Sequence, residues 1–321
     1  MARDASSVVQ FVYNPDVISA MTDRAIGSFF GAASAAAAFG KLVSPTDVVG
    51  LKVFSTPGAV KATNKAIVRT VINALKAAGV PAGNIIVWDK FRFDLETAHF
   101  LPTFQLEEKI PVMATAPDAG YGDEPFYDFE VTGTLIWGDR DFNAKKASAD
   151  INADGTGNLQ LSTKSYFSRL VTQRCTKLIN LPSLCDHPDF GINGALVNMA
   201  IGSVDNSRRF GVRPYFGVPP IPDIYSNPAI NNKVILTVMD ALITTYAGGP
   251  SFRADFSAQT GQIFVATDPV AIDSLCLRQV INLRKTGSNI PTPPWFGVHV
   301  EAAAEYGLGV ADPKKINLST V

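Results

Sequence analysis

Short apolar runs alternate with helix-forming stretches in the first third of the chain. Residues 47–55, 84–88 and 112–116 have the length and the β-branched content of buried strands. Between the first two runs, residues 63–78 repeat apolar side chains at helical spacing, and Gly79 can end that helix. Strands joined through helices in this order predict an α/β fold, with a mainly parallel sheet, right-handed crossovers and flanking helices.

The stretch 117–164 departs from this pattern. It is rich in Asp, Gly and Tyr and holds one candidate strand, 129–137. We interpret it as an irregular, β-containing lid or hairpin inserted in a single α/β domain over residues 1–321, because no composition break marks a linker. Its segment 150–158 resembles a calcium loop, but Leu161 stands where such a loop needs a bidentate Glu, so we predict a flexible turn.

The remaining elements are predicted from turn and capping residues. The expected strands are 8–13, 177–181, 232–245, 262–266 and 316–318, and the expected helices are 15–40, 165–173, 193–201, 269–283 and 295–306. We expect the strands at 49–54, 85–88 and 177–181 to be neighbours in the sheet.

Composition narrows the function. The 321 residues carry a formal net charge of -1, which does not favour binding to nucleic acid. The apolar segment 25–39 is too short to span a bilayer, so no membrane insertion is expected. The three cysteines have no metal-ligand spacing, and the sequence contains neither a dinucleotide-binding nor a phosphate-binding glycine motif. We therefore expect no nucleic-acid partner and no cofactor.

The compartment and the oligomeric state stay open. The chain begins Met1-Ala2-Arg3 without a recognisable signal peptide. This fits a cytoplasmic protein, or a periplasmic one whose export signal has been removed, and a soluble protein is expected in either case.

Chemistry-bearing residues concentrate after the strand 177–181. Asp186 and His187 follow it closely, and ligands in open α/β sheets bind beyond the carboxyl ends of strands. His187 is the side chain of this stretch whose ordinary pKa lies near neutrality, and Asp186 or Asp189 can orient it. We predict His187 as the catalytic acid–base group, with Asp186 beside it.

Substrate-binding residues are predicted nearby. Arg208 and Arg209 can each grip a carboxylate through two parallel hydrogen bonds, and their charge persists at any working pH. Asn193 and Asn198 supply carboxamides from the helix between His187 and the arginines.

Lys52 and Phe54 extend the predicted pocket. Both belong to the carboxyl-terminal part of the buried run 47–55, at the edge where a parallel sheet holds its ligand. With the aromatic residues Phe190 and Phe210, they suit a small, carboxylate-bearing and partly aromatic substrate.

The same residues also allow roles outside catalysis or a different chemistry. The arginines can lie on a solvated face. A lone cysteine such as Cys185 is more often a small buried apolar residue than a nucleophile. A metal bound by Asp186, His187 and a remote carboxylate such as Asp268 would indicate a metal-dependent hydrolase. The spacing of these residues does not favour that site, so we predict no metal.

Motifs along the chain resemble the domain-of-unknown-function family 362, in particular its exported branch with twin-arginine signals. The segments that carry the resemblance are SPTDVVGLKVFST (44–56), GVPAGNIIVWDKFRFDLETAHF (79–100), TKLINLPSLCDHPDFGINGALVNM (176–199), GSVDNSRRF (202–210), LTVMDALITTYAGGP (236–250), ATDPVAIDSL (266–275) and EYGLGVADPKKINL (305–318). The resemblance implies an α/β fold with a site around the Asp-His segment, and it does not imply one reaction.

The chain departs from the family pattern at four positions. The resemblance implies a Lys where this chain has Cys185, a second Lys where it has Val197, an Asn at Phe54 and a His at Gly211. The predicted pocket is therefore less cationic and more apolar than the family pattern.

These observations favour an enzyme of specialised metabolism that acts on a small, partly aromatic carboxylate by acid–base and electrostatic catalysis. A lyase or cyclase is favoured, for example ring closure of an aromatic β-keto acid with loss of carbon dioxide, since such a substrate needs no nucleotide, metal or nucleophile. A weaker resemblance to scytonemin-pathway cyclases points to the same reaction. The alternatives are a non-catalytic small-molecule-binding protein and the metal-dependent hydrolase.

Overall fold

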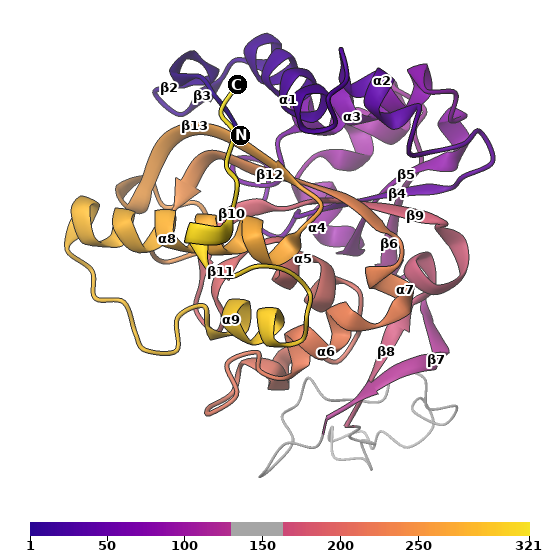
Figure 1. Ribbon diagram of the computed structural model, residues 1–321. Helices are drawn as coiled ribbons and strands as arrows, with labels where there is room; N and C mark the ends of the chain where they lie inside the picture. The colour runs from indigo at the N-terminus through magenta and orange to yellow at the C-terminus, as the bar shows by residue number, and fades with distance from the viewer. Residues whose placement is uncertain (130–162) are drawn as a thin grey trace.

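The computed structural model of the chain describes residues 1–129 and 163–321. It has an α/β fold, in which a mixed, mostly parallel nine-stranded sheet is covered by helices on both faces (Figure 1). The strands are β1 (Ala2–Arg3), β2 (Val8–Val9), β3 (Val12–Tyr13), β4 (Val49–Val53), β5 (Ile85–Phe91), β6 (Val112–Ala116), β7 (Tyr121–Asp128), β8 (Lys164–Ser168), β9 (Lys177–Leu181), β10 (Ser183–His187), β11 (Gly191–Asn193), β12 (Val234–Thr245) and β13 (Ser257–Ala266).

The helices are α1 (Pro15–Phe29), α2 (Ala35–Phe39), α3 (Lys65–Ala77), α4 (Arg92–Thr97), α5 (Ala195–Gly202), α6 (Pro220–Ser226), α7 (Pro228–Asn231), α8 (Pro269–Ser288) and α9 (Val298–Glu305). From α1 to β6 helices alternate with strands, as the sequence predicts. Short 3-10 helices occur at Ala5–Ser7, Ala82–Asn84, Arg208–Gly211, Ala254–Phe256 and Pro313–Lys315, and π-helical turns at Leu101–Glu107 and Leu170–Arg174.

The sheet has the strand order β1-β13-β12-β9-β4-β5-β6. Strand β4 lies between β5 and β9 and is parallel to both, with Val49 opposite Ile85 on one side and Lys177 on the other. This confirms the predicted neighbours. Strand β12 pairs parallel with β9 and then with β10, whereas β13 and β1 run antiparallel at one edge.

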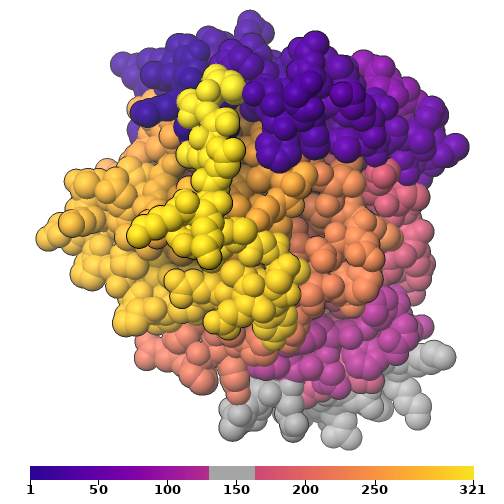
Figure 2. Space-filling model, in the orientation of Figure 1, coloured from indigo at the N-terminus to yellow at the C-terminus, as the bar shows by residue number. Residues whose placement is uncertain are grey.

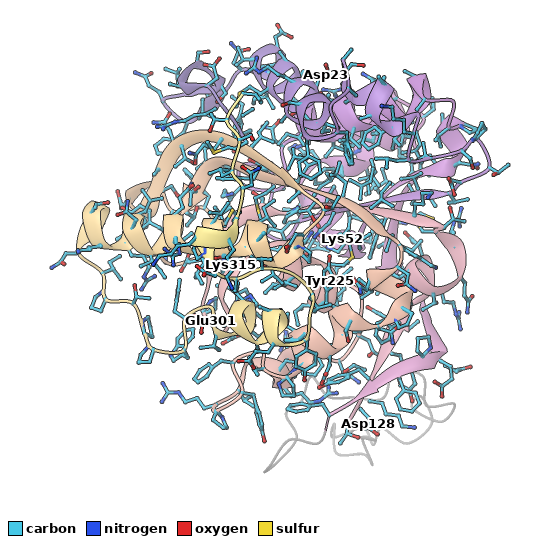
Figure 3. The ribbon with its side chains drawn as sticks, in the orientation of Figure 1. Asp23, Lys52, Asp128, Tyr225, Glu301 and Lys315 are labelled. Carbon is cyan, nitrogen blue, oxygen red and sulfur yellow. The ribbon has the colours of Figure 1, made fainter. Side chains whose placement is uncertain are left out.

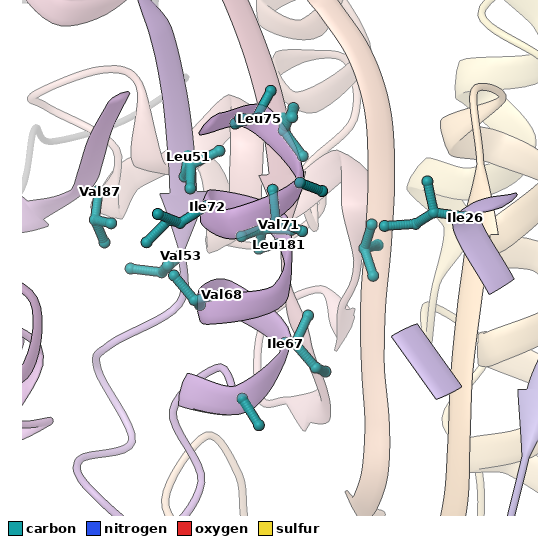
Figure 4. Close-up of a cluster of buried hydrophobic side chains, with 14 of the residues drawn as sticks. Ile26, Leu51, Val53, Ile67, Val68, Val71, Ile72, Leu75, Val87 and Leu181 are labelled. Carbon is teal, nitrogen blue, oxygen red and sulfur yellow. The ribbon is translucent and has the colours of Figure 1, made fainter. Parts of the chain in front are cut away.

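Alternation along β4 divides its side chains between two layers. Leu51 and Val53 face the first layer, where α3 packs Ile67, Val71 and other apolar side chains onto the sheet (Figure 4). Burying one such aliphatic side chain contributes about 1.5–3 kcal/mol, so this cluster dominates the stability of that half of the molecule. Lys52 is directed to the opposite face.

Helix α5 covers the second face of the sheet. Seven of its eight residues are buried, because α6 and α8 pack on the sides that the sheet leaves free. An apolar helix of this kind is stable only inside a protein. It therefore brings Asn198 next to the strand ends of β4 and β9.

Two predictions near the N-terminus are wrong. The run 8–13 forms a hairpin of β2 and β3, because Gln10 and Phe11 adopt positive φ angles of 51° and 60°. The helix expected over 15–40 is broken into α1 and α2: Gly31 takes a φ of 59°, and the Ser34 hydroxyl then accepts the N–H of Ala37 to begin the second helix.

Three more predictions are corrected elsewhere in the chain. The helix expected over 165–173 is strand β8 followed by the π-helical turn, because β8 pairs antiparallel with β7 in a separate two-stranded sheet. Residues 316–318 form no strand; they follow the last 3-10 helix and run over the surface towards the N-terminus (Figure 2). Residues 185–187 are not a loop but the second half of β10.

Two expectations fall outside the described residues. The strand predicted over 129–137 lies there except for its first residue, and so does the segment 150–158 that resembles a calcium loop. Among the described helices, none has the length and apolar composition to cross a membrane.

Candidate functional site

A cavity of about 630 Å³ opens at the carboxyl ends of β4, β5 and β6. Parallel strands bring these ends to one edge of the sheet, where the predicted site was expected. Helix α5 and the segment after it, with Asp205, Ser207 and Arg208, form another part of the cavity wall. The predicted site residues in its lining are Lys52, Phe54, His187, Asn193, Asn198 and Arg208.

Lys52, which is labelled in Figure 3, lines the cavity. Only 1% of its surface is exposed. Its ammonium donates to Asp89 Oδ1 at 2.7 Å, to the Val53 carbonyl at 2.8 Å and to Asn198 Oδ1 at 3.1 Å. Three acceptors match the three N–H groups of an ammonium, so the charge is fully hydrogen-bonded.

Asp89 is the counter-charge of Lys52, and it was not among the predicted site residues. Its second oxygen accepts the backbone N–H and the hydroxyl of Ser55 at 2.8 and 2.6 Å. A buried ion pair of this kind fixes the positions of its two side chains more than it stabilises the fold, because the cost of desolvating both charges offsets their Coulomb attraction. The pair therefore holds the ends of β4 and β5 at a set spacing.

Asn198 and Asn180 connect α5 to the sheet. Asn198 donates to Asn180 Oδ1 at 2.8 Å, and Asn180 donates to the Ala195 carbonyl at 2.8 Å. Asn193 donates to the Ser183 carbonyl at 3.4 Å. Asn193 and Asn198 thus reach the cavity wall as predicted, but their amides already have protein partners.

Lys90 is a cavity residue that was not predicted from the sequence. Its amine donates to the Asp205 carbonyl at 2.6 Å and to Ser207 Oγ at 3.0 Å. Burial lowers the pKa of Lys90 to about 8, despite the opposing charges of Asp205 and Asp89. The sequence offered one clue to Lys90, namely that it directly follows Asp89 near the carboxyl end of β5.

His187 is held as a neutral ring. Its Nδ1 accepts the N–H of Asp189 at 3.1 Å, and the ring stacks on Phe190 with centroids 4.6 Å apart. Burial lowers the pKa of His187 to about 4. With Nδ1 occupied as an acceptor, the remaining proton sits on Nε2, so His187 offers the cavity a neutral N–H donor.

Asp186 does not orient His187 and does not line the cavity. Its Oδ1 accepts the N–H of Gly249 at 2.7 Å, and its Oδ2 lies 4.0 Å from Arg284. The reason is strand alternation: residues 186 and 187 belong to β10, so their side chains leave on opposite sides. Cys185 is fully buried and burial raises its pKa to about 12, which suits a packing residue.

The two predicted arginines have different environments. Arg208 is exposed at the cavity and makes no hydrogen bond or ion pair within the described part of the chain. Arg209 is only 1% exposed and donates to the Asn206 carbonyl, the Thr163 carbonyl and Ser165 Oγ. The 3-10 helix that begins at Arg208 turns the second side chain inwards. Arg209 is therefore a structural residue rather than a substrate-binding one.

Residues from the β7–β8 side complete the wall. Tyr121 and Arg169 line the cavity from that side, and Asp205 lines it from the segment after α5. Asp205 Oδ1 accepts the N–H of Tyr166 and of Asn206, both at 2.7 Å. These residues are far apart in sequence, so no local pattern marks them.

The carboxylate suggested as a remote metal ligand has another role. Asp268 accepts the N–H groups of Val270, Ala271 and Val310, which caps α8 and ties down residue 310. Across residues 1–129 and 163–321, no three His, Cys, Asp or Glu side chains gather closely enough to share an ion.

Comparisons with known proteins give one partial family match and one distant structural neighbour. No curated protein matches the chain. A structural-genomics crystal structure of a Thermotoga maritima protein aligns with a TM-score of 0.44 at 9% identity, over 87% of this chain and 60% of that protein. The chain thus spans about three fifths of the length of that neighbour. The sequence profile of one family matches residues 142–278, and over that range the chain resembles the domain of unknown function 362.

Proposed function

We propose that the protein is an enzyme that acts on a small, partly aromatic carboxylate by acid–base and electrostatic catalysis. The observation that carries the proposal is the guanidinium of Arg208, exposed at a cavity and without a partner among the described residues. A planar guanidinium matches a carboxylate with two parallel hydrogen bonds. Arg169, also exposed at the cavity, offers a second cation.

The charge balance of the cavity supports an anionic ligand. Leaving aside Lys90, whose pKa is lowered, the described lining holds three cationic side chains, Lys52, Arg169 and Arg208, against the two carboxylates of Asp89 and Asp205. Excess positive charge in a low-dielectric recess concentrates anions.

The rest of the wall supports an apolar, partly aromatic body. Phe54, Phe91, Val197 and Ile201 line the cavity together with Pro250. Phe54 and Val197 are two of the positions at which the chain departs from the family pattern. A carboxylate held by arginine at one end and a ring against these side chains would fill such a site.

Lyase or cyclase chemistry on a β-keto acid fits this arrangement best. The ketone must be polarised before the bond to the carboxylate can break, and the neutral Nε2–H of His187 can donate a hydrogen bond to the ketone oxygen. The carbon that lost carbon dioxide is then protonated, or attacks an electrophilic carbon of the same molecule and closes a ring. The resemblance to scytonemin-pathway cyclases supports the second outcome.

Benzoylacetate and its decarboxylated analogue acetophenone test the proposal. We expect calorimetric binding of benzoylacetate in preference to acetophenone, and faster release of carbon dioxide than in buffer alone. Arg208→Ala should lose the preference, whereas Arg174→Ala, an exposed arginine outside the cavity lining, should keep it.

The remaining outcomes separate the alternatives. Binding without turnover of any β-keto acid would indicate a non-catalytic binding protein. Turnover that chelation abolishes and one metal restores would indicate the metal-dependent hydrolase. Equal binding of the acid and the ketone would contradict the carboxylate grip.

A further inference from the structure

Lys52 and Lys90 lie in the same cavity but have different sets of acceptors. Lys52 donates to three oxygens, one of them the carboxylate of Asp89. Lys90 donates to two, the Asp205 carbonyl and Ser207 Oγ, and neither is a carboxylate. An ammonium has three N–H groups to satisfy, whereas a neutral amine has two N–H groups and one lone pair.

The partners of Lys90 therefore match the neutral amine. Both of its N–H groups would be hydrogen-bonded, and the lone pair would be left free on a side chain that lines the cavity. The two bonds also restrain the long side chain, which reduces the entropy lost when the amine reacts.

The charges around Lys90 act in both directions. Burial is the largest effect and lowers the pKa of Lys90 to about 8. Lys52 and Arg208 act in the same direction, whereas the opposing charges of Asp205 and Asp89 favour the ammonium. At pH 7.5 the uncharged fraction of such an amine is roughly 200-fold that of a lysine with an ordinary pKa.

We propose that Lys90 is a nucleophile that forms a covalent iminium with a ketone or aldehyde carbonyl of the ligand. The inference rests on the proposed function for the carboxylate of that ligand, and it narrows the substrate class to carboxylates that also carry a reactive carbonyl. Lysines act in this way when burial or a neighbouring cation keeps the amine uncharged.

The steps balance without an added oxidant or reductant. The amine attacks the carbonyl carbon, a C–N bond forms, and the oxygen takes up a proton to give a carbinolamine. The carbinolamine loses water, which leaves a cationic iminium. In a β-keto acid, the bond to the carboxylate then breaks, carbon dioxide leaves, and the electron pair is accepted by the iminium as an enamine. Protonation at carbon and addition of water release the ketone and regenerate the amine.

A carbonyl probe tests the amine without knowledge of the natural substrate. The protein is treated at pH 7.5 with a limiting amount of 4-carboxybenzaldehyde and sodium cyanoborohydride, and the modified peptides are identified by mass spectrometry. We expect Lys90 to be modified at least ~10-fold more than any lysine outside the cavity, because it combines access from the cavity with a larger uncharged fraction than an ordinary lysine has. Benzaldehyde, which lacks the carboxylate, should label Lys90 less efficiently.

Two variants make this measurement decisive. Lys90→Arg keeps a cation but cannot form an iminium, and it should lose the dominant label. Lys177→Arg changes a lysine at the opposite end of its strand from the cavity and should keep the label on Lys90. Labelling spread over surface lysines, with Lys90 unmodified in the folded wild-type protein, would overturn the inference.

An isotope experiment separates this inference from the proposed function. Turnover of benzoylacetate in ¹⁸O-water through an iminium places ¹⁸O in the acetophenone, because the ketone oxygen leaves as water. Enzymatic turnover without ¹⁸O would overturn the role of Lys90 and leave the carboxylate-processing function standing. Selective labelling of Lys90, without turnover of any β-keto acid, would support the amine and count against the proposed reaction.

Discussion

Asp273 of α8 caps the N-terminus of α5, and Gly194 makes room for its carboxylate. Asp273 Oδ1 accepts the N–H of Ala195 at 2.6 Å, and Oδ2 accepts the N–H of Leu196 at 2.9 Å. A Cβ on residue 194 would overlap the carboxylate. A residue distant in sequence thus satisfies the donors that the first turn of a helix leaves open, and it holds in place the helix that carries Asn198.

We expect Asp273→Asn to destabilise the protein by about 1–3 kcal/mol, because an amide can accept only one of the two N–H groups. The pH dependence gives a second signature. Burial raises the pKa of Asp273 from 3.8 to about 7, so between these pH values the folded carboxyl keeps a proton that the unfolded one has lost. Its contribution to stability is therefore complete below pH 3.8 and is lost as the pH rises through 7.

Urea unfolding at several pH values between 4.5 and 8 measures this contribution. The stability gap between wild type and Asp273→Asn should narrow as the pH rises, whereas the exposed Asp255→Asn control should show no such trend. A gap that widens with pH would mean that the carboxylate, rather than the acid, is the favoured buried form.

The adjacent arginines should give opposite phenotypes. Arg208→Ala should weaken the affinity for a carboxylate ligand by about 10- to 150-fold, the value of a charge-assisted contact of 1.5–3 kcal/mol, and leave unfolding unchanged. Arg208→Lys should recover part of the affinity, since the fork geometry is lost. Arg209→Ala should instead lower the free energy of unfolding by about 1–3 kcal/mol, because buried carbonyls lose their donor.

Paired measurements of ligand titration and thermal unfolding on both variants decide this. Loss of affinity in a fully stable Arg209→Ala protein would reverse the assignment.

His187 should contribute as a hydrogen-bond donor and not as a titrating base. Removing one donor from a developing oxyanion costs about 10²–10³ in kcat, and we expect that loss for His187→Ala. Because burial lowers the pKa of His187 to about 4, the ring is neutral throughout the working range. The rate should therefore show no inflection near pH 6.5, and an inflection there that disappears in His187→Ala would restore the general-base role.

Lys52 should control the ionisation of Lys90 from a distance. Lys52→Met removes a cation that disfavours the ammonium of Lys90 and leaves Asp89 unpaired, so both changes raise the pKa of Lys90 above 8. The midpoint of the pH profile for aldehyde labelling should move upwards. In Lys52→Met/Asp89→Asn both charges are gone, and the midpoint should return towards the wild-type value. An unchanged midpoint in the single variant would show that burial alone sets the ionisation.

The fold was largely predictable because its main signals are local. Strands β4, β5 and β9 are apolar runs bounded by turn residues, and α3 repeats its apolar side chains at helical spacing. The wrong secondary-structure predictions include one where pairing with a distant segment overrides the local pattern. Strand β8 exists because β7 pairs with it, and that partner lies on the other side of a long intervening segment.

The site was predictable only in part, for a different reason. Lys52, His187 and Arg208 line one cavity, and each lies at or near the end of an element that the sequence predicts. Asp186 and Arg209 were misassigned because adjacency in sequence does not determine on which side of a strand or turn a side chain emerges. Lys90 was not predicted because its acceptors come from residues 205–207, more than a hundred positions away. Those acceptors are what distinguish it from any other lysine at the end of a strand.

Asp205 accepts hydrogen bonds from both Lys90 and the β7–β8 sheet, through its backbone carbonyl and its carboxylate respectively. Its carbonyl accepts from the amine of Lys90, while its carboxylate accepts the backbone N–H of Tyr166 in β8. Conversion of the amine to an iminium removes one of its two N–H groups, so the bond to Asp205 must weaken or be shared with Ser207. Hydrogen exchange at the Tyr166 amide would then change when the cavity is occupied covalently, although Tyr166 does not line the cavity. The backbone of β8 thereby becomes a reporter for chemistry at the end of β5.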